Sequence, residues 1–125
     1  MTDMKFRRLG RSGLAVSVVG LGTNNFGMKI SPEQAGAVVD AAFDCGITLF
    51  DTSDSYGASE QVLGELLQGR RDDVLVATKF GSPLTREPVA GANGVDWDAR
   101  GSRRYIRRAV EGSLRRLRTD WIDLY

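Results

Sequence analysis

Short apolar segments alternate with amphipathic segments along most of this chain, and this alternation is the strongest constraint on its fold. Four runs rich in apolar residues are expected as buried strands, and they lie at 16–22, 47–50, 73–80 and 121–125. Three segments with a helical spacing of apolar residues lie between them, at 32–45, 59–68 and 103–117. Repeated strand–helix units predict a parallel sheet with helices packed against it and joined by right-handed crossovers.

The start of the first helix and the segment before the sheet carry clear local signals. Ser31 followed by Pro32 and Gln34 predicts a helix start, with serine as the cap, proline in the first turn and glutamine closing a capping box. Gly46 is expected to end that helix. Upstream, residues 4–15 contain two short extended runs around a glycine-containing turn, which predicts a β-hairpin.

Two parallel architectures compete, an open doubly wound sheet and a closed (β/α)₈ barrel. A doubly wound sheet that binds a dinucleotide needs the pattern G-x-G-x-x-G after its first strand. Here Gly20 and Gly22 are followed by the next glycine only at Gly27, so the third glycine is misplaced. A tight turn after a strand explains the glycine pair equally well, and the residues alone leave both architectures open.

Chemically capable side chains follow two of the predicted strands. Asp51 comes directly after the second strand, and Tyr56 lies in the connection behind it. Lys79 stands near the end of the third strand, where apolar neighbours would make its burial costly without a carboxylate partner. In a barrel the carboxyl ends of all strands face one mouth, so we expect Asp51 and Lys79 to pair there.

This combination of side chains can move a proton. A lysine ammonium next to a phenol favours the phenolate, so Tyr56 could exchange a proton with a carbonyl or alcohol oxygen. The carboxylate of Asp51 would hold the ammonium in place. The residues therefore predict general acid–base chemistry at one edge of the sheet.

Three motifs of the chain resemble those of the aldo-keto reductases, in the same order and spacing. They are GITLFDTSDSYGASEQVLGELL, VATKFG and YIRRAVEGSLRRLRTDWIDLY, and the resemblance covers the whole chain. The family fold is an α/β (β/α)₈ TIM barrel with an N-terminal hairpin across its bottom. The resemblance implies that residues 1–125 are the N-terminal half of such a barrel, with the hairpin, the first four strands and three helices. Phe50 and Val76 are expected in the barrel interior.

The resemblance also implies an activity and a site. Family members reduce aldehydes and ketones to alcohols with NADPH and without a metal. Matched by motif, Tyr56 would be the proton donor, Lys79 would assist it, and Asp51 would hold Lys79. Four residues fall where the family contacts nicotinamide and its ribose: Gly22, Thr23, Asn24 and Asp51.

The chain departs from the family pattern at its C-terminal end. The fourth catalytic residue of the family is a histidine just beyond the motif DLY, whereas this sequence stops at Tyr125 and contains no histidine. A (β/α)₈ barrel takes about 250 residues, roughly twice this length. We therefore expect a truncated or partial form that is poorly stable or self-associating and shows no NADPH-dependent reductase activity on its own.

Two other functions stay open beside the reductase. Lys79 could form a Schiff base with a carbonyl substrate, as barrel aldolases do, although the neighbouring carboxylate and phenol argue against this. A non-catalytic NADPH-sensing or interaction subunit of the same fold is the other alternative. The residues do not identify the natural carbonyl substrate.

Composition argues against several classes of protein. The net charge of +1 disfavours a dedicated nucleic-acid or membrane-surface binder, and no apolar stretch approaches the ~20 residues of a membrane span. The N-terminus lacks the apolar region of a secretory signal, and the single cysteine fits a reducing compartment, so a cytoplasmic protein is expected. Without histidine, a zinc site would lack its commonest ligand, and no metal site is expected.

Three further features of the sequence are its cysteine, an arginine-rich segment and a long loop. Cys45, next to the glycine that ends the first helix, is expected to be a packed, inert thiol. The arginines of 103–118 are expected on a solvated outer face rather than on nucleic acid. The polar, glycine-rich loop from Gly81 to about Gly101 is long enough to suggest a function, and its Trp97 could line a substrate pocket or anchor the loop.

Overall fold

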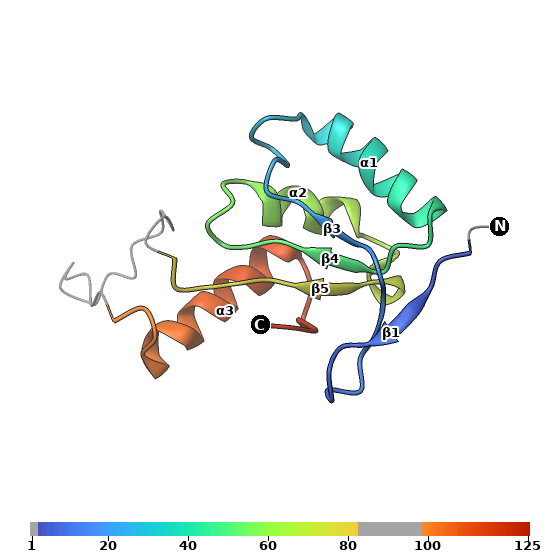
Figure 1. Cartoon of the computed structure of the whole chain (residues 1–125). Coiled ribbons are helices and arrows are strands. Elements are labelled where there is room, and N and C mark those ends of the chain that lie inside the picture. Colours follow the sequence, from blue (N-terminus) through green and yellow to red (C-terminus); the bar gives the residue numbers. More distant parts are fainter. Residues whose placement is uncertain (1–2, 83–98) are drawn as a thin grey trace.

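The computed structural model describes residues 3–82 and 99–125 (Figure 1). A short hairpin is followed by a parallel sheet with α-helices packed against it. The elements, in chain order, are β1 (Phe6–Arg8), β2 (Ala15–Ser17), β3 (Gly20–Gly22), α1 (Pro32–Asp44), β4 (Leu49–Asp51), α2 (Ser59–Leu66), the 3₁₀ helix η1 (Arg71–Asp73), β5 (Leu75–Ala77) and α3 (Arg103–Leu117). Within the described residues, no helix is long and apolar enough to cross a membrane.

The sheet is parallel, and its strands are adjacent in the order of the sequence, β3-β4-β5. Its register places Leu21, Phe50 and Val76 in one row across the three strands. The next row contains the last residue of each strand, so all three strands end at a common edge. This sequential parallel order is the one that the strand–helix alternation predicts.

The fourth expected strand is present only near its end. In place of a strand over 121–125, a single parallel bridge joins Leu124 to Ala77 at the end of β5. The carbonyl of Trp121 accepts a hydrogen bond from the Arg71 guanidinium at 3.1 Å rather than pairing with β5. The ladder is therefore short here, and the described part of the sheet consists of three strands and this bridge.

The hairpin forms as expected, but the run 16–22 is divided between two sheets. β1 pairs with β2 in antiparallel register, and Ser17 and Thr48 exchange hydrogen bonds between their backbone N–H and hydroxyl groups at 3.1 and 2.9 Å. The Ser17 hydroxyl also donates to the carbonyl of Val19 at 2.6 Å, where the chain bends before β3. Because Thr48 directly precedes β4, the hairpin lies at the amino ends of the parallel strands (Figure 1).

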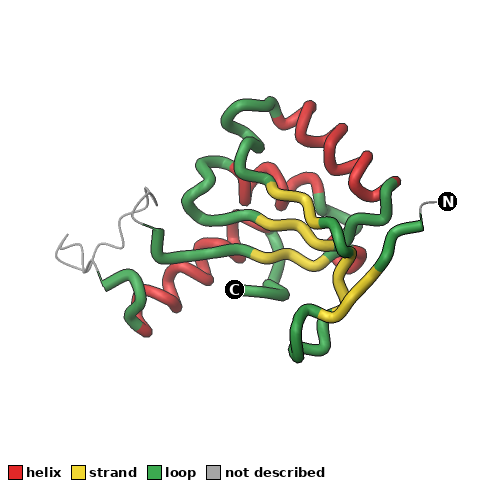
Figure 2. The backbone as a smooth tube through the Cα atoms, in the orientation of Figure 1, coloured by secondary structure: helices red, strands yellow, loops and turns green. Residues whose placement is uncertain are grey.

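The helices begin and end close to the predicted positions. Ser31 caps α1: its hydroxyl accepts from the Gln34 N–H at 3.2 Å, and the Gln34 side chain accepts from the Ser31 N–H at 2.9 Å. Gly46 follows with φ of 75°, a left-handed conformation that suits glycine. Ser102 caps α3. Figures 1 and 2 show α2 between α1 and α3, and it contacts both.

The core lies between the sheet and the helices. Phe50 is fully buried, packs edge to face on Phe43 of α1 with ring centres 5.7 Å apart, and shares its row with Val76. The expectation that Phe50 and Val76 point into a barrel interior is therefore wrong. Alternate residues of a strand face opposite sides of the sheet, and these two face the helices. On the other side, Leu49 and Leu75 are only half-buried.

Two expectations about surface residues need correction. Cys45 is exposed rather than packed, because it follows α1 at the C-cap, beyond the buried stripe of that helix. Most arginines of 103–118 are exposed as expected, but only 15% of the Arg116 side chain is exposed, and it is paired inside the protein. Trp97 and most of its loop lie outside the described residues.

Candidate active site

Three predicted site residues lie at the carboxyl ends of two neighbouring strands. Asp51 is the last residue of β4, and Lys79 follows β5 by two positions. Tyr56 lies in the connection from β4 to α2, where its N–H donates to the carbonyl of Ser53 at 3.1 Å. The same connection is tied to the segment after β5, because the N–H of Asp54 donates to the carbonyl of Lys79 at 3.2 Å. Parallel pairing of β4 with β5 thus brings the three side chains to one edge of the sheet.

The Lys79 ammonium is the centre of this group. Its Nζ donates to both carboxylate oxygens of Asp51, at 2.8 and 2.7 Å, and to the carbonyl of Thr52 at 2.8 Å. The Tyr56 hydroxyl lies 3.5 Å from the same Nζ, which is 5.0 Å from the centre of the Tyr56 ring. The structure therefore brings together the carboxylate, the ammonium and the phenol that the sequence singled out.

The ion pair is open to solvent. The side chains of Lys79 and Asp51 are 48% and 43% exposed, and water screens a pair of this kind, so it contributes little to stability. Lys79 is therefore not buried, and the argument that its burial would be costly does not apply. The partner expected from that argument, Asp51, is nevertheless the one found. The pair holds the ammonium within reach of the phenol while both stay accessible to a small molecule.

The last residue of β3 and the two residues after it lie at the same edge but differ in exposure. Gly22, in register with Asp51, is exposed, and an added Cβ there would meet open space. Asn24 is exposed as well. Thr23 has no exposed surface, and its hydroxyl donates to the carbonyl of Asp51 at 2.9 Å and lies 2.8 Å from the Ser59 hydroxyl. A group bound at this edge would meet Gly22 and Asn24 directly, whereas Thr23 supports the edge from beneath.

A buried hydroxyl cluster fastens this edge to the first turn of α2. The Ser59 hydroxyl donates to the carbonyl of Thr23 at 2.7 Å and lies 2.9 Å from the Thr52 hydroxyl. All three side chains are buried. The cluster was not predicted, because Thr23 lies one residue after the predicted strand 16–22 and Thr52 two residues after 47–50; only the observed ends of β3 and β4 make the two positions equivalent.

Glu60 is a second residue of the site region that was not predicted. Its side chain is 1% exposed, and its carboxylate accepts from the Thr78 hydroxyl and from Nε of Arg116, each at 2.6 Å. Helical spacing could have revealed it, because Glu60 lies one turn before Leu63 and two turns before Leu67, on the buried stripe of α2. A carboxylate on that stripe requires a buried cation, which is Arg116.

Tyr125 lies near the carboxylates of Asp54 and Glu60. Its ring stacks on Phe80 with centroids 4.8 Å apart. Partial burial, together with the negative charges of Asp54 and Glu60, raises the pKa of the Tyr125 phenol above its ordinary value. Tyr125 therefore stays protonated over a wider pH range than a tyrosine with an ordinary pKa does.

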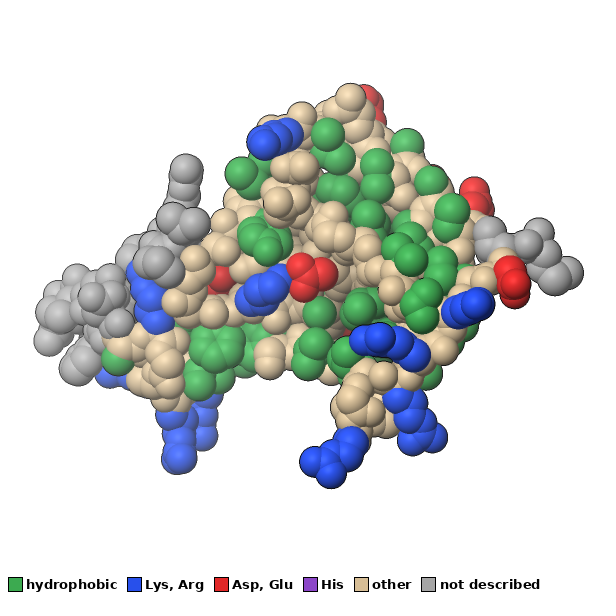
Figure 3. Space-filling model, viewed as in Figure 1, with side chains coloured by type: hydrophobic (Ala, Val, Ile, Leu, Met, Phe, Trp, Pro, Cys, Tyr) green, Lys and Arg blue, Asp and Glu red, His purple; other side chains and the backbone are tan. Residues whose placement is uncertain are grey.

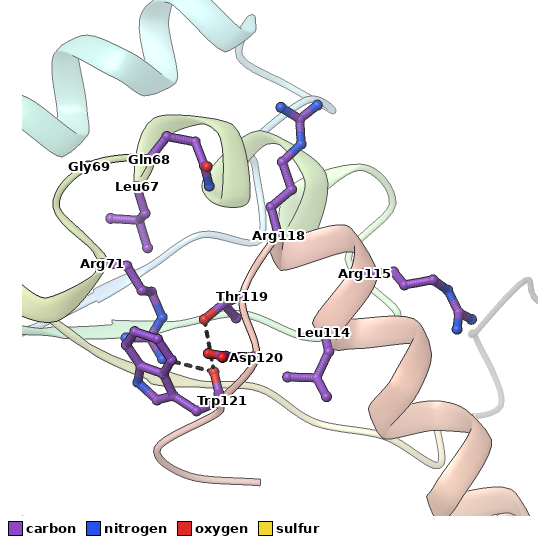
Figure 4. Close-up of a pocket in the computed structure, with 10 residues that line it drawn as sticks. All are labelled: Leu67, Gln68, Gly69, Arg71, Leu114, Arg115, Arg118, Thr119, Asp120 and Trp121. Carbon is purple, nitrogen blue, oxygen red and sulfur yellow. Dashed lines mark hydrogen bonds between the residues drawn. The ribbon is translucent and has the colours of Figure 1, made fainter.

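A separate groove lies between the carboxyl-terminal ends of α2 and α3 (Figure 4). It has a volume of about 620 Å³, and Leu67, Leu114 and Trp121 form apolar parts of its lining. Arg71, at its edge, lies over the Trp121 ring at 4.5 Å and pairs with Asp123 at 2.7 Å. No predicted site residue is among those that line the groove in the described part of the chain, so it is distinct from the candidate active site.

Comparison with known sequences agrees with the motifs. The model of the Aldo/keto reductase family matches residues 18–125. The uncharacterized oxidoreductases YqkF and YrpG of Bacillus subtilis (strain 168) are 41% and 43% identical to this chain over 124 and 132 residues, and each match covers 98% of the chain. The chain spans only 38% and 39% of the length of these two relatives.

Comparison with solved structures gives the same result for the fold. The aldo-keto reductase AKR11C1 from Bacillus halodurans, in its holo form, matches with a TM-score of 0.77 and 39% sequence identity. The match covers 98% of this chain and 39% of that structure. The fold described above therefore agrees with the corresponding part of a longer protein.

Proposed function

Because the chain belongs to the aldo/keto reductase family, we propose that it carries the proton-donating part of an NADPH-dependent oxidoreductase that reduces aldehydes or ketones to alcohols. The observation that carries this proposal is the Lys79 ammonium, which lies within hydrogen-bonding distance of Asp51 and Tyr56 at once. A carbonyl group reduced by a hydride needs one proton at its oxygen, and the Tyr56 phenol can supply it.

The edge of the sheet beside this group fits a nicotinamide cofactor, which supplies the hydride when bound. Gly22 leaves open space where a side chain would otherwise stand, and Asn24 offers an exposed amide. In this proposal Gly22, Asn24 and Asp51 receive the nicotinamide and its ribose, and Thr23 holds the edge from beneath. NADPH, rather than NADH, is proposed on the family resemblance.

The proposed role of each side chain follows from its hydrogen-bonding capacity. Tyr56 gives its proton to the substrate oxygen as the carbonyl carbon accepts the hydride, which leaves an alcohol and a phenolate. Lys79 stabilises that phenolate by its positive charge, and Asp51 holds the ammonium in place. Water then returns a proton to Tyr56, so the enzyme ends the cycle unchanged and the reaction can also run toward the carbonyl.

The contacts of Lys79 disfavour the Schiff-base alternative. A lysine that attacks a carbonyl carbon must first lose its proton to free a lone pair. Here the ammonium donates three short hydrogen bonds, two of them to the Asp51 carboxylate, and an attack on a carbonyl carbon would give them up. A proton-transfer role keeps these hydrogen bonds.

The proposal is tested in a hybrid in which residues 1–125 replace the matching N-terminal part of a full-length relative. We expect the hybrid to oxidise NADPH in the presence of aldehydes or ketones, faster than it oxidises NADH, and residues 1–125 alone to show no turnover. Lys79→Met should abolish turnover in the hybrid, whereas Lys29→Met, at an exposed lysine outside the site, should not.

Three results would contradict the proposal. NADPH binding without turnover by the hybrid would favour the sensing or interaction subunit. Trapping of a carbonyl substrate on Lys79 by borohydride would favour the Schiff-base route. Equal turnover in the Lys79→Met and Lys29→Met variants would remove Lys79 from the chemistry.

A further inference from the structure

A buried ion pair beneath the candidate active site joins three elements of the fold. Glu60 on α2 accepts one hydrogen bond from Thr78, which follows β5, and one from Arg116 on α3. Only 1% of the Glu60 side chain and 15% of the Arg116 side chain are exposed. None of these three residues has a part in the chemistry proposed above.

Burial makes the Glu60–Arg116 ion pair costly in free energy to form. It also makes the removal of either partner destabilising. Moving a carboxylate and a guanidinium out of water costs free energy, which the pair recovers only with good geometry and further hydrogen bonds. Each oxygen of Glu60 has its own donor, and Nη2 of Arg116 lies 3.5 Å from the Ser113 hydroxyl. Apolar side chains of similar volume could often fill such a space with no loss of stability. The directional bonds to specific atoms are what a charged pair adds.

Thr78 connects this pair to Lys79. Its side chain is buried against Glu60, and its backbone N–H donates to the carbonyl of Leu124 at 3.0 Å, so both its side chain and its backbone are held. Successive residues in extended backbone point to opposite sides. Holding the Thr78 side chain inward therefore directs the Lys79 side chain outward, toward Asp51.

We propose that Glu60 is a positioning residue: through Thr78 it fixes the chain after β5 and so holds the Lys79 ammonium between Asp51 and Tyr56. The consequence for catalysis rests on the proposed function, but the position of Lys79 can be measured without turnover. If Glu60 did no more than stabilise the packing of α2 on α3, loss of the Thr78 hydroxyl would leave Lys79 unaffected.

Competitive acetylation of the full-length hybrid, read at each lysine of residues 1–125 by peptide mapping, measures how firmly Lys79 is held. The lysines of the sequence are Lys5, Lys29 and Lys79, and the first two are exposed, so they serve as internal references. A lysine nitrogen must leave its hydrogen-bond acceptors before it can attack the reagent, so a held lysine is acetylated more slowly than a free one. We expect Glu60→Gln and Thr78→Val to raise the relative rate at Lys79 roughly two- to fivefold, the range that an exposed ion pair supports.

Matched variants distinguish a loss of Lys79 positioning from a general loss of stability. Thr78→Ser keeps the hydroxyl and should restore the wild-type rate. Glu65→Gln breaks the exposed ion pair of Glu65 with Arg118, which joins the same two helices, and should leave Lys79 unchanged. Val39→Ala removes core methyl groups and serves as a variant of reduced stability, with the loss measured by urea unfolding.

The outcomes decide the proposal in either direction. Asp51→Asn, which removes the charge beside Lys79, must raise the rate and so shows that the assay responds. The proposal is overturned if Thr78→Val then leaves the rate unchanged, or if Val39→Ala raises it as much as Glu60→Gln does at equal stability. Should Glu60→Gln fail to fold, Thr78→Val alone decides. Acetylation needs neither NADPH nor a substrate, so failure of the proposed function would leave this result intact.

Discussion

Hydrogen bonding at Lys79 leaves the hydroxyl hydrogen of the neighbouring Tyr56 phenol available for the proton transfer proposed above. The ammonium gives short bonds to Asp51 and Thr52 and keeps the Tyr56 hydroxyl at 3.5 Å. An ammonium carries donors only, so the Tyr56 oxygen can accept from it but cannot donate to it. The hydroxyl hydrogen of Tyr56 therefore stays available for a substrate oxygen, which is what a proton donor requires.

The phenol of Tyr125 predicts a pH dependence of stability. Its pKa is raised above the ordinary 10.0, so at higher pH the unfolded chain loses this proton while the folded chain keeps it. The folded state then binds more protons than the unfolded state, and the free energy of unfolding falls as the pH rises past 10.0. Tyr125→Phe should lose less stability than the wild type between about pH 9 and about pH 11, as measured by urea unfolding. Equal losses in both proteins would contradict this assignment.

Among the secondary-structure elements, α2 and α3 approach each other so closely that only glycine fits between them. A Cβ added at Gly64 would stand 2.6 Å from the carbonyl oxygen of Arg116 and 2.6 Å from the carbonyl carbon of Leu117. Both are backbone atoms, which cannot move aside as a flexible side chain can. This close approach lets Glu60 on α2 reach Arg116 on α3.

Gly64→Ala should therefore destabilise the fold by about 1–3 kcal/mol, as overpacking does, although alanine has the higher helix propensity. Gly36→Ala in α1 is the matched control, because its added methyl group would meet only Cδ2 of Leu66, at 3.4 Å. That variant should be neutral or stabilising. Urea unfolding of both variants checks the prediction, and equal stability would mean that α2 and α3 can separate without cost.

Which features could be predicted from the sequence depends on how local their causes are. The caps Ser31 and Ser102 were predictable because a cap depends on its immediate neighbours. The pairing of Asp51 with Lys79 was predictable because neighbouring parallel strands end at a common edge. The direction of Phe50 was not, since it depends on which face of the sheet the helices cover.

The pairing of Glu60 with Arg116 was also beyond sequence reasoning. The two residues are 56 positions apart, and only the packing of two helices brings them together. Six other arginine positions in and just after α3 are exposed, at 103, 104, 107, 108, 115 and 118, so composition alone did not distinguish Arg116 from them. Helical periodicity identifies buried stripes, but it does not say which charges on two stripes will meet.

For the molecule as a whole, several large apolar side chains remain uncovered. Val18, Val19 and Leu124 are 51%, 51% and 45% exposed, and Figure 3 shows hydrophobic side chains gathered in the middle of one face. Surfaces of this kind usually meet further protein. The matched relatives are more than twice as long as this chain, which is why we expect residues 1–125 to self-associate and to need the remaining part of a barrel for turnover.

The decisive measurement is the turnover of Tyr56→Phe in the hybrid reductase. We predict that kcat falls by about 10²–10⁴, because the variant has lost its transferable proton, while the Kd for NADPH stays unchanged. Tyr105→Phe is the matched control, since the Tyr105 hydroxyl is bonded to Arg100 instead of Lys79, and it should keep wild-type turnover. Wild-type turnover in Tyr56→Phe would contradict the proposed proton transfer at this site.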